Sequence, residues 1–320
     1  MEKVMKLFST ARDPRELLRA VWFSAGVPLV AIALFLWLWS ISAARVQTSL
    51  GAVPGPAQVL EQAHGLIDDH FSERAKQKAF YERQEKRNQE ILTEDPKAQI
   101  TLHQWTGKPT YFDQILTSLK TVFTGFLLAT AVAVPLGIVC GLSPTVQSAL
   151  NPMIQVFRPV SPLAWLPIVT LIVSAVYVTS SGAWFEKSFL VSAITVTLCS
   201  LWPTLINTAI GVTSVDRDLL NVSRVLQLPW GTKVRKIVLP SSLPYIFTGM
   251  RLSLGVGWMV LIAAEMLAQN PGLGKFVWDE FQNGSSESLG RIMVAVLTIG
   301  VIGFLLDRVM LGLQTLSARR

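Results

Sequence analysis

The sequence contains few charged residues. Asp, Glu, Lys and Arg make up 15% of its 320 residues, whereas 51% are hydrophobic, and the mean hydropathy is +0.44. A soluble domain of this size carries about 25% charged residues. The charges are also unevenly spread and leave apolar stretches of ~20 residues, enough to cross a hydrocarbon core of ~30 Å. This composition excludes most soluble folds and predicts an all-α polytopic membrane protein.

Cysteine and histidine are scarce as well. Cys140 and Cys199 lie inside apolar segments, and the three histidines (His64, His70, His103) fall in one charged stretch. Neither residue type has the spacing of a disulfide framework or a metal site. We therefore expect no bound metal and no histidine relay within the membrane.

Catalytic motifs are missing too. The sequence has neither His-Glu-x-x-His nor Gly-x-Ser-x-Gly, and Gly272-Leu273-Gly274-Lys275 is followed by Phe276 where a phosphate loop requires Ser or Thr. An intramembrane enzyme would need paired acids, a Ser/His pair or a metal cluster within the spans. We predict no catalytic residue and no ATP site in this chain.

The formal net charge of +7 invites a nucleic-acid interpretation. The cations, however, lie mainly at the ends of apolar segments and in loops, as the positive-inside bias of membrane proteins explains. We expect the lipid bilayer, and no nucleic acid, as the partner of these charges.

Six apolar segments remain once these classes are excluded. They cover residues 21–44, 121–142, 159–178, 188–212, 244–267 and 292–313. Each is predicted to be a transmembrane helix, with a turn over residues 144–152 before the third. The first segment exceeds the 7–15 residues of a signal-peptide core, so we expect an uncleaved helix.

The spans and their flanking charges predict the organisation of the chain. Residues 1–20 form a basic cytoplasmic N-terminus, 21–44 the first span, 45–117 a charged periplasmic loop, 118–313 a five-helix core and 314–320 a cytoplasmic C-terminus. The charged loop reads as a solvated helix or hairpin with balanced charges. The sequence is compatible with two roles for this loop, a spacer or a docking surface.

A polar, cationic stretch, residues 216–240, separates the fourth and fifth spans. Its first half, 219–228, predicts a short amphipathic helix with Leu219, Val222, Val225 and Leu226 on one side, ended by Pro229. A second helical piece, 232–239, is expected to end at Pro240. A short helix with an apolar stripe beside a membrane suits docking into another protein.

This stretch resembles the coupling loop of ABC importer permeases, which begins with Glu-Ala-Ala and ends with Ile-x-Leu-Pro. Asn221-Val222-Ser223 stands in place of Glu-Ala-Ala, Gln227 in place of the motif's glycine, and Ile237-Val238-Leu239-Pro240 matches the ending. The resemblance implies that the loop couples the permease to an ATPase. The implied coupling residues are Leu219, Asn221, Val222, Ser223, Arg224, Val225, Leu226, Gln227, Leu228, Leu239 and Pro240.

Four further motifs are similar to the nitrate, sulfonate, taurine and bicarbonate branch of these permeases. They are Val53-Pro54-Gly55-Pro56, the stretch from Ser118-Leu119-Lys120 to Pro135-Leu136-Gly137, the stretch Arg158 to Pro167, and Ala263-Ala264-Glu265-Met266 with Gly272-Leu273-Gly274. The resemblance implies six helices around a type I importer core in the bacterial inner membrane. The implied cargo is a small anion, with nitrate or nitrite first and bicarbonate or a sulfonate such as taurine as the alternative.

The same resemblance implies several partners: two ATPase subunits that use ATP and Mg²⁺, a periplasmic or lipid-anchored solute-binding protein, and a second permease copy. No cofactor is expected on this chain itself. An ion channel is the more distant alternative, and no ring of carbonyls or charges that could form a filter is apparent.

Proline-interrupted helices often line transport routes, because the freed carbonyls must face protein or water. The predicted path residues are Arg158, Ser161, Trp165, Asn207 and Glu265. Arg158 is either a transient partner for an anion or an interfacial arginine that reaches the headgroups. Glu265 either pairs with Arg251 or Arg291, is protonated, or reaches water near the outer end of its span.

Overall fold

The computed structural model describes residues 14–48, 51–94, 100, 102–177 and 185–318, and nearly all of this part is helical. The helices are α2 (Pro14–Val21), α3 (Val27–Ala43), α4 (Pro56–Glu94), α5 (Tyr111–Leu142), α6 (Pro144–Phe157), α7 (Pro162–Val176), α8 (Lys187–Thr213), α9 (Arg217–Val225), α10 (Trp230–Lys233), α11 (Leu239–Ala268), α12 (Leu273–Asn283) and α13 (Ser288–Ala318). Two π-helical turns, η1 (Trp22–Gly26) and η2 (Val234–Val238), join α2 to α3 and α10 to α11. Within the described residues the strands are β1 (Gln47–Thr48) and β2 (Gly51–Ala52), a short antiparallel pair. The predicted all-α class is confirmed.

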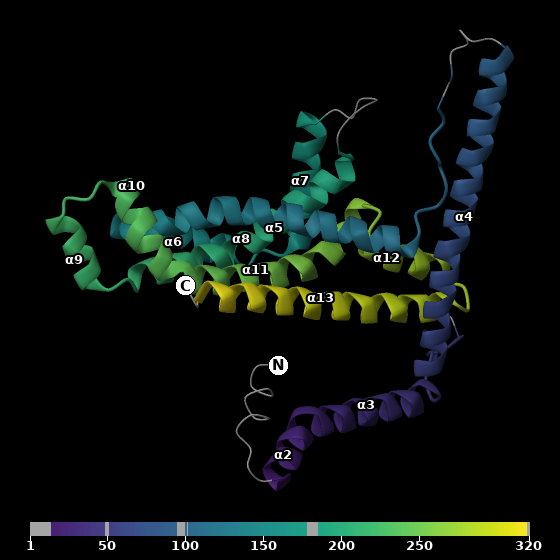
Figure 1. The fold of residues 1–320 in the computed structure, drawn as a ribbon, viewed down its shortest axis with the longest axis horizontal. Coiled ribbons are helices and arrows are strands. Elements are labelled where there is room, and N and C mark those ends of the chain that lie inside the picture. Colours follow the sequence, from purple (N-terminus) through teal and green to yellow (C-terminus); the bar gives the residue numbers. More distant parts are fainter. Residues whose placement is uncertain (1–13, 49–50, 95–99, 101, 178–184, 319–320) are drawn as a thin grey trace.

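Five helical stretches are long and apolar enough to cross a membrane: Arg19–Ala43, Tyr111–Leu142, Lys187–Thr213, Trp230–Ala268 and Ser288–Ser317. The bent pair of α6 and α7 passes the same test when taken together, which gives the six spans predicted from the sequence. Helices α5, α8, α11 and α13 run along the long axis and form the bundle (Figure 1).

The third span differs from the expectation. Residues 144–152 form the first part of helix α6, where the sequence predicted a turn, and α6 meets α7 at a bend of 102°. Pro144 is tolerated because it occupies the first turn of α6, where its missing N–H has no helical partner anyway. The break follows from Pro159 and Pro162, which cannot donate the hydrogen bonds that would continue the helix.

Helix α8 is the centre of the bundle and packs closely against α5 and α11. At three points along α5, at Gly125, Gly137 and Gly141, an added Cβ would approach a backbone carbonyl oxygen of α8 to 2.7–2.8 Å. Only glycine permits so close an approach. Small residues at helix contacts are the usual route to tight packing in membranes, where the hydrophobic effect does not drive helices together.

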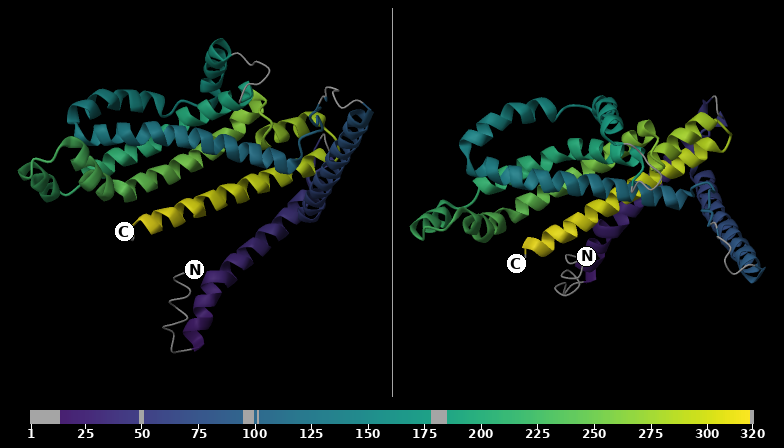
Figure 2. Two further views of the ribbon diagram at one scale, coloured as in Figure 1. Left: turned by 45° about the horizontal axis from the view of Figure 1, so that its top comes forward. Right: turned by 90° about the horizontal axis from the view of Figure 1, so that it is seen from above.

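Helix α4 lies across one end of the bundle (Figure 2). At ~1.5 Å per residue its 39 residues span about 58 Å. The middle of α4 is held against the start of α5, because His70 Nδ1 lies 2.7 Å from Thr110 Oγ1 and Arg74 forms an ion pair with Asp113. The charged segment therefore contains one long helix, which settles the choice between a helix and a hairpin. Helix α5 already begins at Tyr111, within the segment expected to be loop up to residue 117.

Helices α9 and α10 and the end of α13 lie at one end of the bundle, and α4 and α12 lie at the other (Figures 1 and 2). This separation is the one that counting spans along the sequence requires. Residues 1–13 of the predicted N-terminal segment 1–20, and residues 319–320 of the C-terminal segment 314–320, lie outside the described residues.

Candidate functional site

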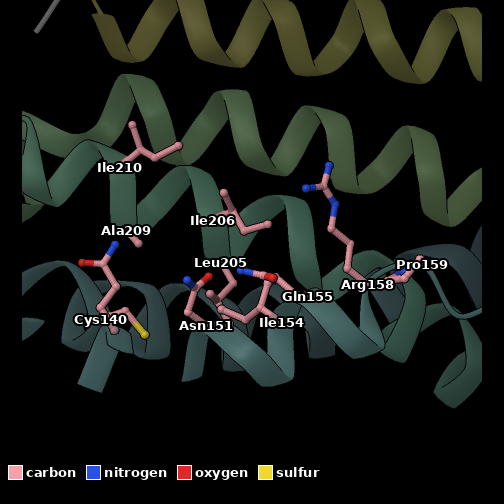
Figure 3. Close-up of a pocket in the computed structure, with 11 residues that line it drawn as sticks. Cys140, Asn151, Ile154, Gln155, Arg158, Pro159, Leu205, Ile206, Ala209 and Ile210 are labelled. Carbon is pink, nitrogen blue, oxygen red and sulfur yellow. The ribbon is translucent and has the colours of Figure 1, made fainter. Parts of the chain in front are cut away.

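A cavity of about 700 Å³ opens between α6 and α8 (Figure 3). It is lined by Cys140, Gln147, Asn151, Ile154, Gln155, Arg158, Pro159, Leu205, Ile206, Ala209 and Ile210. Arg158 is the one charged residue among them, and none of them is acidic. The cavity therefore offers a positive charge and neutral amides to a bound solute.

The two walls of this cavity differ in character. Helix α6 supplies the polar side chains, which include Arg158 at its carboxyl end, whereas α8 supplies an apolar wall of Leu205, Ile206, Ala209 and Ile210. An ion between these walls would find polar partners on the α6 side only, because the α8 side is apolar. A one-sided polar surface favours passage over tight retention, because desolvation of the ion is compensated incompletely.

Of the five predicted path residues only Arg158 lines this cavity. The Ser161 hydroxyl accepts a hydrogen bond from the backbone N–H of Leu163 (3.3 Å) and so caps α7. The Asn207 amide donates to the carbonyl oxygen of Pro203 (2.8 Å) within α8. Both of these polar groups have local partners, and the structure does not bring them to the cavity.

Trp165 lies beside the bend between α6 and α7, in an aromatic cluster with Phe157 and Trp202. The Phe157 ring centroid lies 5.8 Å from that of Trp165 and 6.5 Å from that of Trp202, on which it stacks. The indole nitrogens of both tryptophans are buried without a hydrogen-bond partner in the described part of the chain. Phe157 directly precedes Arg158 in the chain, but none of the three aromatic residues lines the cavity.

Sequence reasoning missed the amides Gln147, Asn151 and Gln155 as lining residues. They recur every four residues, which places them on one face of a helix. This signal was present in the sequence, but it is visible only if residues 144–157 are helical. The prediction of a turn over residues 144–152 concealed it.

Glu265 is fully buried near the end of α11. Ser118 Oγ lies 2.9 and 2.7 Å from its two carboxylate oxygens, the backbone N–H of Gly274 donates to Oε2 (3.0 Å), and Asn270 Nδ2 lies 3.4 Å from Oε1. The expectations that Glu265 pairs with an arginine or reaches water are therefore wrong. Its hydrogen bonds tie α5, α11 and the start of α12 together, away from the cavity.

The two arginines considered as partners of Glu265 bind other acids. Arg251 Nε and Nη2 contact the two carboxylate oxygens of Asp307 at 2.5 and 2.9 Å, which links α11 to α13. Arg291 Nη1 lies 3.5 Å from Glu280. Asp307 is an acidic residue within the sixth span that the sequence analysis overlooked.

The loop between the fourth and fifth spans contains α9, which begins at the N-cap Asp216. Its end is a two-bond cap: the N–H of Gln227 donates to the carbonyl of Arg224 and the N–H of Leu228 to that of Ser223, both at 3.0 Å. Gln227 has a φ of +48°, a left-handed conformation that favours glycine. The helix thus ends through this cap, before Pro229, which was predicted to end it. The geometry also explains why the resembling motif has glycine at this position.

One face of α9 packs against the bundle and another is exposed. Leu220 packs against a cluster that includes Val212 and Val238, and the Ser223 hydroxyl, which is buried, donates to the carbonyl oxygen of Leu220 (2.6 Å). The predicted docking residues are exposed: Leu219 by 46%, Val222 by 53%, Val225 by 81% and Leu226 by 62%. Arg224 Nη1 lies 3.5 Å from Asn221 Oδ1 on the surface.

The second half of the loop differs from the prediction. Helix α10, η2 and α11 form one continuous helical stretch, Trp230–Ala268, so no helix ends at Pro240. Leu239 and Pro240 form the first residues of α11, directly after the π-helical turn η2. The changed hydrogen-bond register of a π-helical turn accommodates the missing N–H of Pro240.

Residues 133–320 match the family described as the binding-protein-dependent transport system inner membrane component. The nitrate import permease protein NrtB of Synechocystis sp. is 34% identical over 289 residues, which cover 90% of this chain and 88% of the relative. The bicarbonate transport system permease protein CmpB of Synechococcus elongatus is 36% identical over 204 residues, 63% of this chain and 68% of the relative.

Among solved structures, the MetNI methionine ABC transporter, described in inward facing conformations, superimposes with a TM-score of 0.55 at 13% sequence identity. The match covers 65% of this chain and 95% of that chain, and at this identity it shows the fold alone. Together with the six spans, the family match shows that the chain belongs to the binding-protein-dependent transport system inner membrane components, the multi-pass permeases of ABC importers.

Proposed function

We propose that this permease imports a small anion, with nitrate or nitrite as the first candidate. The observation that carries this proposal is the cavity between α6 and α8, in which Arg158 is the one charged lining residue and no carboxylate opposes an anion. The planar guanidinium group matches the oxygen edge of a planar oxyanion. The relatives named for nitrate import support the same ranking.

Bicarbonate is the second candidate and an organosulfonate such as taurine the third. Bicarbonate is also a planar, singly charged oxyanion, so Arg158 would recognise it by the same contacts. Relatives named for bicarbonate transport are 36–38% identical to this chain, which supports keeping it directly behind nitrate.

The exposed stripe of α9 supports a docking role for the loop at residues 216–240. In this proposal two ATPase subunits bind the stripes of two permease copies, and those subunits, not this chain, bind ATP and Mg²⁺. A solute-binding protein delivers the anion at the end where α4 and α12 lie. The cargo shifts the equilibrium between the two access states only through its different affinity for each.

In this proposal the α9 end lies in the cytoplasm, together with both termini. Single cysteines at residues 85 and 230, both exposed, test this orientation in a variant without Cys140 and Cys199. An impermeant thiol reagent added to spheroplasts should label position 85 and spare position 230. Labelling of 230 alone would reverse the assignment.

The importer proposal is tested in liposomes that contain the permease, its ATPase subunits and its binding protein. We expect ATP-dependent uptake of labelled nitrate that exceeds that of bicarbonate and taurine. Uptake of a cation or a neutral solute with none of these anions would contradict the proposal. Flux of anions without ATP would favour the channel alternative.

A further inference from the structure

Four polar side chains form a continuous stripe along α6. Gln147, Asn151, Gln155 and Arg158 follow each other at intervals of four, four and three residues, which is the spacing of one helix face. All four are exposed and line the cavity, to which α8 contributes an apolar wall. Figure 3 labels Asn151, Gln155 and Arg158. At ~1.5 Å per residue the stripe extends for about 16 Å along the helix.

The stripe side chains are free to receive a ligand. In the described part of the chain none of the four side chains has a hydrogen-bond or ion-pair partner. Asn207, the nearby amide within α8, differs in this respect because it donates to a carbonyl of its own helix. The three exposed amides therefore keep their donors available on the cavity side of α6.

The direction of the stripe follows from its two ends. Arg158 lies at the bend between α6 and α7. Gln147 lies near the start of α6, just after Leu142, and Leu142 packs in the same cluster as Leu220 of α9. The stripe therefore leads from the bend toward the end of the bundle that carries α9.

The strength of anion binding is expected to differ along the stripe. Arg158 supplies the positive charge and a two-pronged donor, whereas the three amides supply neutral N–H donors that bind an anion more weakly. One cation with no acid nearby balances an anion of a single charge. A doubly charged anion would keep an uncompensated charge against the apolar wall of α8, which is costly.

From these observations we infer that Gln147, Asn151 and Gln155 form a ladder of donors that passes a singly charged oxyanion from Arg158 toward the α9 end of the bundle. This inference rests on the proposed anion transport. It assigns the part of the anion's route between Arg158 and the α9 end of the bundle to these three amides. It also predicts that divalent oxyanions such as sulfate are excluded at the stripe.

The test replaces an amide by the carboxylate of the same shape. Asn151→Asp and Gln155→Glu each remove donors and place a negative charge in the stripe. In the reconstituted system, nitrate uptake should fall at least about tenfold, because like charges at close range cost several times the thermal energy. Ser148→Asp, on the same helix but outside the cavity lining, is the matched control and should leave uptake within about twofold of the wild type.

Co-purification with the ATPase subunits shows whether each variant still assembles. If the Asp and Glu variants assemble and keep wild-type nitrate uptake, the ladder is wrong while anion transport stands. If the wild type moves none of the anions, the proposed function and the ladder fail together, because the ladder was inferred for a singly charged oxyanion. Loss of a bound phospholipid from Asn151→Asp without a change in uptake would show a lipid site instead and overturn the inference.

Discussion

Ser118 in α5 lies within hydrogen-bonding distance of both carboxylate oxygens of Glu265 in α11, at 2.9 and 2.7 Å. The same hydroxyl accepts a hydrogen bond from the backbone N–H of Leu273 (2.8 Å), so three helices meet at one buried carboxyl group. A Cβ atom at Gly272 would overlap this carboxyl group. The motifs at residues 263–266 and 272–274, separate in the sequence, thus form one unit in space.

Ser118→Ala should destabilise the permease by about 1–3 kcal/mol, because it removes a hydrogen-bond partner from a fully buried carboxyl group. Thermal unfolding of the detergent-solubilised protein, followed by tryptophan fluorescence, measures the effect. Thr117→Ala is the control, because the Thr117 hydroxyl only donates to the carbonyl oxygen of Asp113 on its own helix (3.0 Å). Identical midpoints for the two variants would contradict a special role for this contact.

The ion pair between Arg251 and Asp307 should couple α11 to α13. We expect each of Arg251→Gln and Asp307→Asn to destabilise the protein, and the double variant to lose less than the sum of the two single effects. Chemical unfolding of the four proteins completes the cycle. Strict additivity of the two single effects would show that the pair contributes nothing.

Gln227→Gly should stabilise the loop, because glycine adopts the left-handed conformation at this position without strain. We expect a gain of up to about 1 kcal/mol in the free energy of unfolding. Gln227→Ala is the control, since alanine keeps the strain and should give no gain. If both variants shift the unfolding midpoint alike, the backbone conformation is not the cause.

Leu226→Asp should prevent docking of the ATPase subunit, because it puts a charge on the exposed apolar stripe of α9, where no partner for it is expected. The variant should insert into the membrane normally and fail to co-purify with the ATPase. Thr213→Asp, at an exposed position just before the loop, controls for the added charge alone. Unchanged co-purification of Leu226→Asp would rule out this stripe as the docking surface.

The sequence predicted what depends on composition and on local apolar periodicity: the helical class, the six spans and the exposed stripe of α9. The prediction from the sequence failed at prolines, because a proline can lie either after the end of a helix or in its first turn. Pro144 starts a helix and Pro240 lies at the start of one that continues from a π-helical turn, yet each resembles a stop signal in the sequence. The error at Pro144 also hid the polar face of α6.

Side-chain contacts between helices that are distant in the sequence could not be predicted, for a different reason. The partner of Glu265 is a serine from another helix, and the partner of Arg251 is an aspartate 56 residues away. Charge alone suggested Arg251 or Arg291 as the partner of Glu265. This prediction was wrong because close packing sets the depth and rotation of each helix, and the sequence does not reveal either. Glycines at the α5–α8 contact determine that packing.

Nitrate uptake by the Arg158 variants tests the central claim most directly. Wild-type permease, Arg158→Lys and Arg158→Gln are compared in liposomes with the same ATPase subunits and binding protein. We predict that Arg158→Gln loses at least about tenfold in nitrate uptake and that Arg158→Lys keeps an intermediate level, because lysine retains the charge but not the two-pronged geometry. Wild-type uptake by an assembled Arg158→Gln permease would contradict an anion route through this cavity.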